Sequence, residues 1–201
     1  MAYIIPTINA GQLVKGAPIS DFIGADLRKA VRISQSGPEQ HENIVWVHPA
    51  AGDLSSLVRI AWQWMDRWQQ LGCPIAVDVE TSSTAFVDCK LYSISLSGVD
   101  GMNTAVAFTL MDLHSLTWEA ERVLIGKMTE ILADPRVPKV FHNAAFDRAV
   151  IMRKGWNITG QTIDTMALAH LIQPDGPKDL GWIGHTYLDV EPWKLNHDGR
   201  K

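Results

Sequence analysis

The sequence has few cysteines, no excess of basic charge and no long apolar run. Its two cysteines, Cys73 and Cys89, form no Cys-x-x-Cys pair and have no His-x-x-x-His partner, so neither a disulfide framework nor a zinc site is indicated. Lysine and arginine number 18 against 22 acidic residues, a net charge of -4, which excludes a protein that holds nucleic acid through a bulk basic surface. Any contact with nucleic acid is therefore expected to be local.

Export and membrane signals are also missing. The segment Met1–Pro6 has no charged n-region and no sustained apolar h-region, and no stretch reaches the roughly 18 apolar residues of a spanning helix. We expect a cytoplasmic protein without a membrane partner.

What the sequence does contain is enough apolar material for a core. Of its 201 residues, 46% are hydrophobic and 20% are charged, which is typical of one soluble domain, with or without an appendage. Residues 1–43 are punctuated by proline and glycine and are interpreted as an irregular arm, with one short helix possible at 21–33. The folded domain is expected to span residues 44–201.

Strand and helix signals alternate along that domain, which predicts an α/β fold with a mixed central sheet and flanking helices. Asp53 is the expected N-cap of a long helix that Gly72 ends, and the tryptophans on it are assigned to the core rather than to a base-stacking platform. Strands are predicted at 44–47, 75–80, 91–96, 104–108 and 139–142, and helices at 54–71, 117–134, 143–154, 164–172 and 178–187.

Carboxylates carry the chemical signal. Asp78 and Glu80 are two apart on a predicted strand, so their side chains point to one face and can share an ion. Apolar neighbours mark that strand as buried, where two like charges repel unless a cation compensates them. Asp147, in the first turn of the helix that begins at Asn143, is a possible third ligand.

Oxygen ligands of this kind suit Mg²⁺ or Mn²⁺, and two such ions roughly 4 Å apart promote in-line displacement at phosphorus. The implied chemistry is phosphodiester hydrolysis. Spacing alone leaves alternatives open, because Asp-x-Glu also occurs on solvated edge strands and an acid in a first helical turn is common.

Three strings add specificity when taken in order: Asp78-Val79-Glu80-Thr81, His142-Asn143-Ala144-Ala145-Phe146-Asp147, and Ile163-Asp164-Thr165-Met166-Ala167-Leu168-Ala169. They resemble the first two exonuclease motifs and the Asp-Thr helix of DEDD-type 3′–5′ exonucleases, and in particular the proofreading domain of family A DNA polymerases. The resemblance runs from about Ile44 to the C-terminus and implies a ribonuclease H-like fold. Residues 187–194 resemble phage-encoded polymerases, which suggests a bacterial or phage-infected host cell.

The resemblance also implies roles for individual residues. Asp78 would bridge two metal ions, Glu80 would bind the ion that activates water, and Asp147 would hold the second. Asn143 would contact the substrate backbone, and the main chain at Thr81 would line the pocket for the terminal nucleotide of a single-stranded DNA 3′ end. His142 is assigned a structural hydrogen bond, and Asp164 the N-cap of the helix that follows it.

The family's fourth carboxylate has no clear counterpart. The nearest imitation is Tyr187-x-x-x-Glu191, but Pro192 pushes Glu191 out of the helical region, so both are weak candidates. We therefore expect a chain that ends before this motif, with weak or absent activity in isolation and a polymerase region encoded downstream or separately. The alternatives are a non-catalytic nucleic-acid-binding or polymerase-assembly module and an RNase D-like exoribonuclease.

Overall fold

The computed structural model describes residues 30–36, 43–47, 53–85, 88–102, 104–110 and 117–188, except for the side chains of residues 43, 44, 46 and 185. Two compact units divide the chain. One is His41–Thr165, and the other contains the described residues 30–36 and 166–188. Residues 30–36 are helical and overlap the helix predicted at 21–33, and Asn43 belongs to the first strand, whereas the rest of the predicted arm lies outside the described residues. The domain limits at residue 44 stay a prediction.

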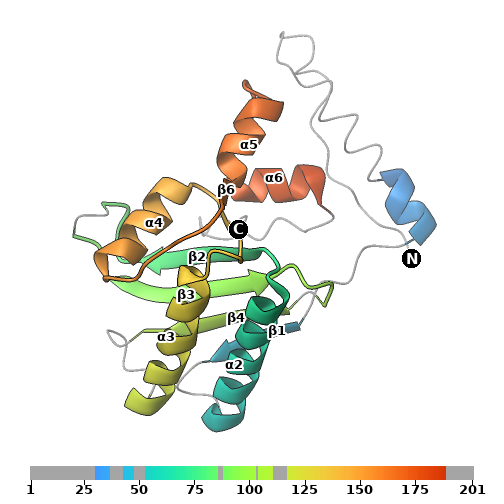
Figure 1. Ribbon diagram of the computed structural model, residues 1–201. Coiled ribbons are helices and arrows are strands. Elements are labelled where there is room, and N and C mark those ends of the chain that lie inside the picture. Colours follow the sequence, from blue (N-terminus) through green and yellow to red (C-terminus); the bar gives the residue numbers. More distant parts are fainter. Residues whose placement is uncertain are drawn as a thin grey trace, which may run out of the picture. The chain divides into compact units, whose positions relative to one another are not determined.

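A six-stranded mixed sheet organises the larger unit (Figure 1). Its spatial order is β1-β4-β3-β2-β5-β6; β2, β3 and β4 form the predicted antiparallel meander, and the other three strands run parallel to their neighbours. The α/β prediction is confirmed, although β6 was not predicted. The strands are β1 (Asn43–Val47), β2 (Ile75–Thr81), β3 (Leu91–Gly98), β4 (Thr104–Thr109), β5 (Lys139–Phe141) and β6 (Thr162–Asp164).

Helices α2 (Leu54–Leu71) and α3 (Trp118–Ala133) pack against each other and lie together on one side of the sheet (Figure 1). The predicted ends of α2 are confirmed, because Asp53 Oδ1 accepts from Ser56 N at 3.1 Å and Gly72 takes the left-handed conformation. Trp68 is fully buried, but Trp62 is 39% exposed and lies against Lys127, so its assignment to the core was wrong.

The direction of the β2 side chains follows from how β2 pairs with β3. Ile75 lies opposite Gly98, and a Cβ on Gly98 would collide with the indole of Trp68 on α2. Because side chains alternate along a strand, Ile75, Val77 and Val79 face α2 and are buried. Asp78 and Glu80 therefore point to the opposite face, where both are exposed, so the predicted burial of their strand holds for one face only.

Three further helices complete the described chain: α4 (Ala144–Arg153), α5 (Thr165–Ile172) and α6 (Leu180–Tyr187). Helix α4 contacts β5 and β6 and lies on the side of the sheet away from α2 and α3 (Figure 1). Helix α6 begins at Asp179, whose Oδ1 accepts from Trp182 N at 2.8 Å. Within the described ranges, no helix is long and apolar enough to cross a bilayer.

Candidate active site

Asp78 and Glu80 lie at the carboxyl end of β2, beyond the last residues paired with β5. Pairing between β2 and β5 covers only Ile75 and Ala76, and the register with β3 shifts between Glu80 and Thr81. A register shift of this kind bends a strand and redirects its side chains. Both carboxylates therefore stand on an open face, on a stretch of β2 that carries no partner strand on the β5 side.

Asp147 supplies a third carboxylate from the first turn of α4. Its side chain is only 4% exposed. Burial and then the negative charges of Asp78, Asp164 and Glu80, in that order, together raise the pKa of Asp147 from 3.8 to about 7. The structure thus brings the three predicted acids, and a fourth that was not predicted as part of the site, into one electrostatic field.

This donor set has the chemistry of a divalent-cation site. A buried carboxylate with negatively charged neighbours, such as Asp147, is costly without a compensating positive charge, and hard oxygen ligands match Mg²⁺ and Mn²⁺. Across the residues that the structure describes, however, no three acidic, histidine or cysteine side chains are arranged so that they could hold one ion together.

Asn143 and Thr81 flank these acids. Asn143 has φ 71° and ψ 56°, the left-handed conformation, and its exposed side chain makes no capping hydrogen bond to α4. Asn143 is the N-cap residue of α4, as the predicted start of this helix implies, but it makes no capping bond through its side chain. Thr81 Oγ1 donates to Ser83 O at 2.9 Å, which fixes the turn that follows β2.

Asp164 binds the backbone at the start of α4. It ends β6, and its two carboxylate oxygens accept from the backbone N–H groups of Asn143 at 3.1 Å and Ala144 at 2.9 Å. This contact with Ala144, 20 residues earlier in the chain, was not predicted, and the role of Asp164 as N-cap of the helix that follows it stays a prediction. The missed signal is Thr162-Ile163, a β-branched pair that pairs with β5 and carries Asp164 to this position.

His142 and Thr165 lie beside this cap. His142 Nδ1 is 2.9 Å from Thr165 Oγ1, and that hydroxyl lies 3.0 Å from Phe141 O. The structural hydrogen bond predicted for His142 is confirmed.

The structure does not place either weak candidate for the fourth ligand, Tyr187 or Glu191, at the site. Tyr187 is the last residue of α6, in the other compact unit, and is exposed. Glu191 lies outside the described residues.

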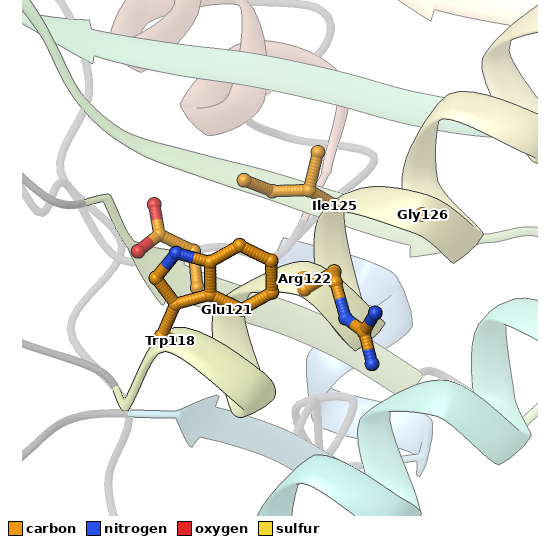
Figure 2. A pocket seen from close by; sticks show the side chains of 5 residues that line it. All are labelled: Trp118, Glu121, Arg122, Ile125 and Gly126. Carbon is orange, nitrogen blue, oxygen red and sulfur yellow. The ribbon is translucent and has the colours of Figure 1, made fainter.

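A pocket of about 380 Å³ on α3 is distinct from the carboxylate cluster (Figure 2). Its lining has one carboxylate, that of Glu121, and none of the predicted site residues. Trp118 is largely exposed, and the Arg122 guanidinium stacks 5.2 Å from its ring centre. The pocket lacks the paired acids that metal-dependent hydrolysis needs. It is lined by Trp118, Glu121, Arg122, Ile125 and Gly126.

Comparison with known proteins points to the same chemistry as the carboxylates. DNA polymerase I from Synechocystis is 30% identical over 114 residues, which cover 57% of this chain and 12% of the polymerase. Two solved structures have similar folds: the apo form of a nuclease (TM-score 0.54, 22% identity, 68% of this chain and 60% of that chain) and Escherichia coli RNase D, an exoribonuclease (TM-score 0.50, 17% identity, 76% and 34%). This chain thus spans a small part of the polymerase and about three fifths of the nuclease.

The two structural similarities show the ribonuclease H-like arrangement alone. The family model described as 3′–5′ exonuclease, of the DNA polymerase A type, matches residues 60–196, well over half of the chain. That range includes the carboxyl end of β2, the whole of α4, and Asp164 at the end of β6. The chain therefore belongs to the 3′–5′ exonuclease family.

Proposed function

We propose that this protein hydrolyses the 3′-terminal phosphodiester of single-stranded DNA, as a proofreading-type exonuclease that uses Mg²⁺ or Mn²⁺. One observation carries the proposal. Asp147 is buried in the first turn of α4 and lies within the electrostatic field of Asp78 and Glu80, two exposed acids on one face of β2. A cluster of this kind is stable when a divalent ion neutralises it.

Asp78, Glu80 and Asp147 would hold the ion or ions. When bound, divalent ions supply an activated water and neutralise charge on the leaving 3′ oxygen. The exposed amide of Asn143 is proposed to contact the sugar-phosphate backbone, and the main chain at Thr81 to line the pocket of the terminal nucleotide. Burial of Asp147 gives it a different role from the exposed pair, because it provides a fixed anchor and they provide adjustable ligands.

Nucleic acid as the substrate is supported by the relatives. The Synechocystis relative is a DNA polymerase, whereas a Trypanosoma brucei RNase D of similar fold (TM-score 0.51, 16% identity, 74% of this chain and 47% of that chain) was solved in complex with RNA. The polymerase similarity rests on higher sequence identity, so we propose DNA as the substrate. A polymerase region, encoded downstream or separately, is proposed as the partner.

Degradation of a 3′-labelled single-stranded oligonucleotide in Mg²⁺ or Mn²⁺ tests this function. Since only three of the four family acids have clear counterparts, we expect slow hydrolysis, and at least about 100-fold slower hydrolysis in Asp78→Ala and in Asp147→Ala. Asp175→Ala, an exposed acid in a turn of the other unit, is the matched control. Equal rates in the wild type and both site variants would exclude the assignment.

The same assay separates the alternatives. An oligoribonucleotide of identical sequence that is degraded faster than the DNA would establish an RNase D-like activity, because proteins distinguish RNA through its 2′-hydroxyl groups. Binding of the oligonucleotide without hydrolysis in either metal, and without gain of activity when the polymerase region is supplied, would establish a non-catalytic module.

A further inference from the structure

We propose that Asp164 and Thr165 are positioning residues that fix the turn between β5 and α4, so that Asn143 and Asp147 present their side chains to substrate and metal. This inference rests on the proposed function and extends it to two residues that lie outside the set of three acids. It is carried by four hydrogen bonds, all within the unit His41–Thr165.

Helix α4 begins without a hydrogen bond from the side chain of its own N-cap residue. The first backbone N–H groups of a helix have no partner within the helix and are usually satisfied by the side chain of the N-cap residue itself. Here the N-cap is Asn143, whose side chain makes no such bond, and the carboxylate of Asp164 accepts from Asn143 N and Ala144 N instead. A carboxylate in this place also has a favourable interaction with the helix dipole.

The Asn143 side chain stays outside these contacts. Its amide makes no capping bond and is exposed, while Asp164 binds the backbone N–H groups on either side of the Asn143 Cα. Asn143 takes a left-handed backbone conformation, which asparagine tolerates better than most residues, and it alone among the described non-glycine residues has a positive φ. The turn therefore directs a hydrogen-bonding amide away from its own helix.

Thr165 holds the two residues before Asn143. A hydroxyl has one hydrogen to donate, and Phe141 O can only accept, so Thr165 Oγ1 donates to Phe141 O at 3.0 Å. The same oxygen must then accept from His142 Nδ1 at 2.9 Å, which requires a proton on that nitrogen. Together, Asp164 and Thr165 bind four successive residues of the turn, 141–144, from the end of the adjacent strand.

Asp147 depends on this turn through the geometry of the helix. Successive residues of an α-helix are rotated by about 100°, so the point at which the chain enters α4 determines the direction of a side chain one turn later. Asp147 is the acidic residue of that first turn. A change at the cap is therefore expected to turn Asp147 away from Asp78 and Glu80 without unfolding the sheet.

The pair Thr165→Val and Thr165→Ser tests the inference without a change of charge. Valine has nearly the shape of threonine but loses both hydrogen bonds, whereas serine keeps them. We expect Thr165→Val to weaken Mn²⁺ binding about 10-fold, measured by isothermal titration calorimetry on protein shown to be folded, and Thr165→Ser to stay within about twofold of the wild type. Affinity of a 3′-ended oligonucleotide in Ca²⁺ provides a second readout and should follow the same order.

A second comparison keeps the inference testable if Thr165→Val fails to fold. Asp164→Asn removes one acceptor from the α4 cap, and Asp53→Asn is its matched control, since Asp53 caps α2 through Ser56 N. We expect weaker Mn²⁺ binding in Asp164→Asn only.

The outcomes distinguish this inference from the proposed function. If Asp147→Asn binds Mn²⁺ as the wild type does, the proposed function fails. If Asp147→Asn loses Mn²⁺ binding while Thr165→Val keeps wild-type affinity, or while Asp164→Asn and Asp53→Asn behave alike, the positioning role is overturned and the metal site stands.

Discussion

At the scale of single residues, Asp147 combines burial with three neighbouring negative charges. Its raised pKa means that the folded protein binds a proton at this carboxyl more tightly than the unfolded chain does. Between about pH 4 and pH 7 the folded state therefore holds more protons, and the contribution of Asp147 to the free energy of unfolding falls as the pH rises. The penalty is absent below pH 4 and complete above pH 7.

Asp147→Asn should remove this pH dependence. Since a tenfold change in proton affinity corresponds to about 1.4 kcal/mol and the pKa rises from 3.8 to about 7, we expect the variant to gain about 4 kcal/mol relative to the wild type between pH 4 and pH 8. Urea denaturation in EDTA at several pH values measures this difference, and Asp175→Asn is the control. Parallel pH profiles for the wild type and Asp147→Asn would contradict the burial and repulsion described here.

Sequence predicts part of this site well because some of its geometry is local. Asp78 and Glu80 share a face because strands alternate with a period of two, and Asp147 lies in a first turn because Asn143 follows a short strand. The cap of α4 is different, since its acceptor comes from Asp164, 20 residues later, through pairing of β5 with β6. No local pattern around Asn143 indicates that Asp164 binds the backbone N–H groups of Asn143 and Ala144.

At the scale of elements, α2 and β3 approach each other closely where Trp68 lies over Gly98. A Cβ added to Gly98 would lie 2.2 Å from Trp68 Cδ1 and 2.3 Å from Nε1, and both residues are buried. The indole fills the place where a β3 side chain would stand, so α2 sits close to the sheet. This contact supports the meander that holds β2 and its carboxylates.

Gly98→Ala should therefore destabilise the protein by about 2–3 kcal/mol, because the rigid indole cannot move without shifting α2. Thermal and urea unfolding measure the loss. Gly126→Ala is the matched control: a Cβ there meets nothing within 4 Å, and alanine in a helix should add up to about 1 kcal/mol.

A double mutant shows whether the indole is the cause. Trp68 Nε1 has no hydrogen-bond partner within the part of the chain that the structure describes, so a smaller ring loses no such bond. We expect Gly98→Ala to cost less in a Trp68→Phe background than in the wild type. Equal costs in the two backgrounds would contradict the contact.

The elements that sequence predicts correctly are those with long periodic patterns or clear caps. Helix α2 has its apolar spacing, Asp53 and Gly72, and α3 has Thr117, whose Oγ1 accepts from Ala120 N at 3.3 Å. Strand β6 has only three residues and is defined by its register with β5 rather than by its own composition. Trp62 is exposed although it lies on a correctly predicted helix. A helical spacing of apolar residues predicts the helix, but it does not determine which of these residues contact the sheet.

At the scale of the whole molecule, acidic residues exceed basic ones by four, and several cations are engaged within the protein. Lys127 Nζ lies 2.6 Å from Asp66 Oδ1, Arg67 Nε lies 3.1 Å from Asp100 Oδ2, and Arg136 bonds to Asp134 at 2.6 Å. The buried Lys139 donates to the carbonyls of Asp134 and Thr159 at 2.5 and 2.9 Å. These four charges are committed to the fold rather than available for a phosphate backbone.

Binding of single-stranded DNA should accordingly depend weakly on salt. Each phosphate neutralised by a protein cation contributes about -0.7 to the slope of log K against log salt, so a grip of three or four contacts gives a slope between about -2 and -3. Fluorescence anisotropy of a labelled oligonucleotide between 50 and 200 mM NaCl, with Ca²⁺ in place of Mg²⁺ to prevent cleavage, measures it. A slope steeper than about -5 corresponds to about seven neutralised phosphates, which would require an extended basic surface and would contradict a local grip at the 3′ end.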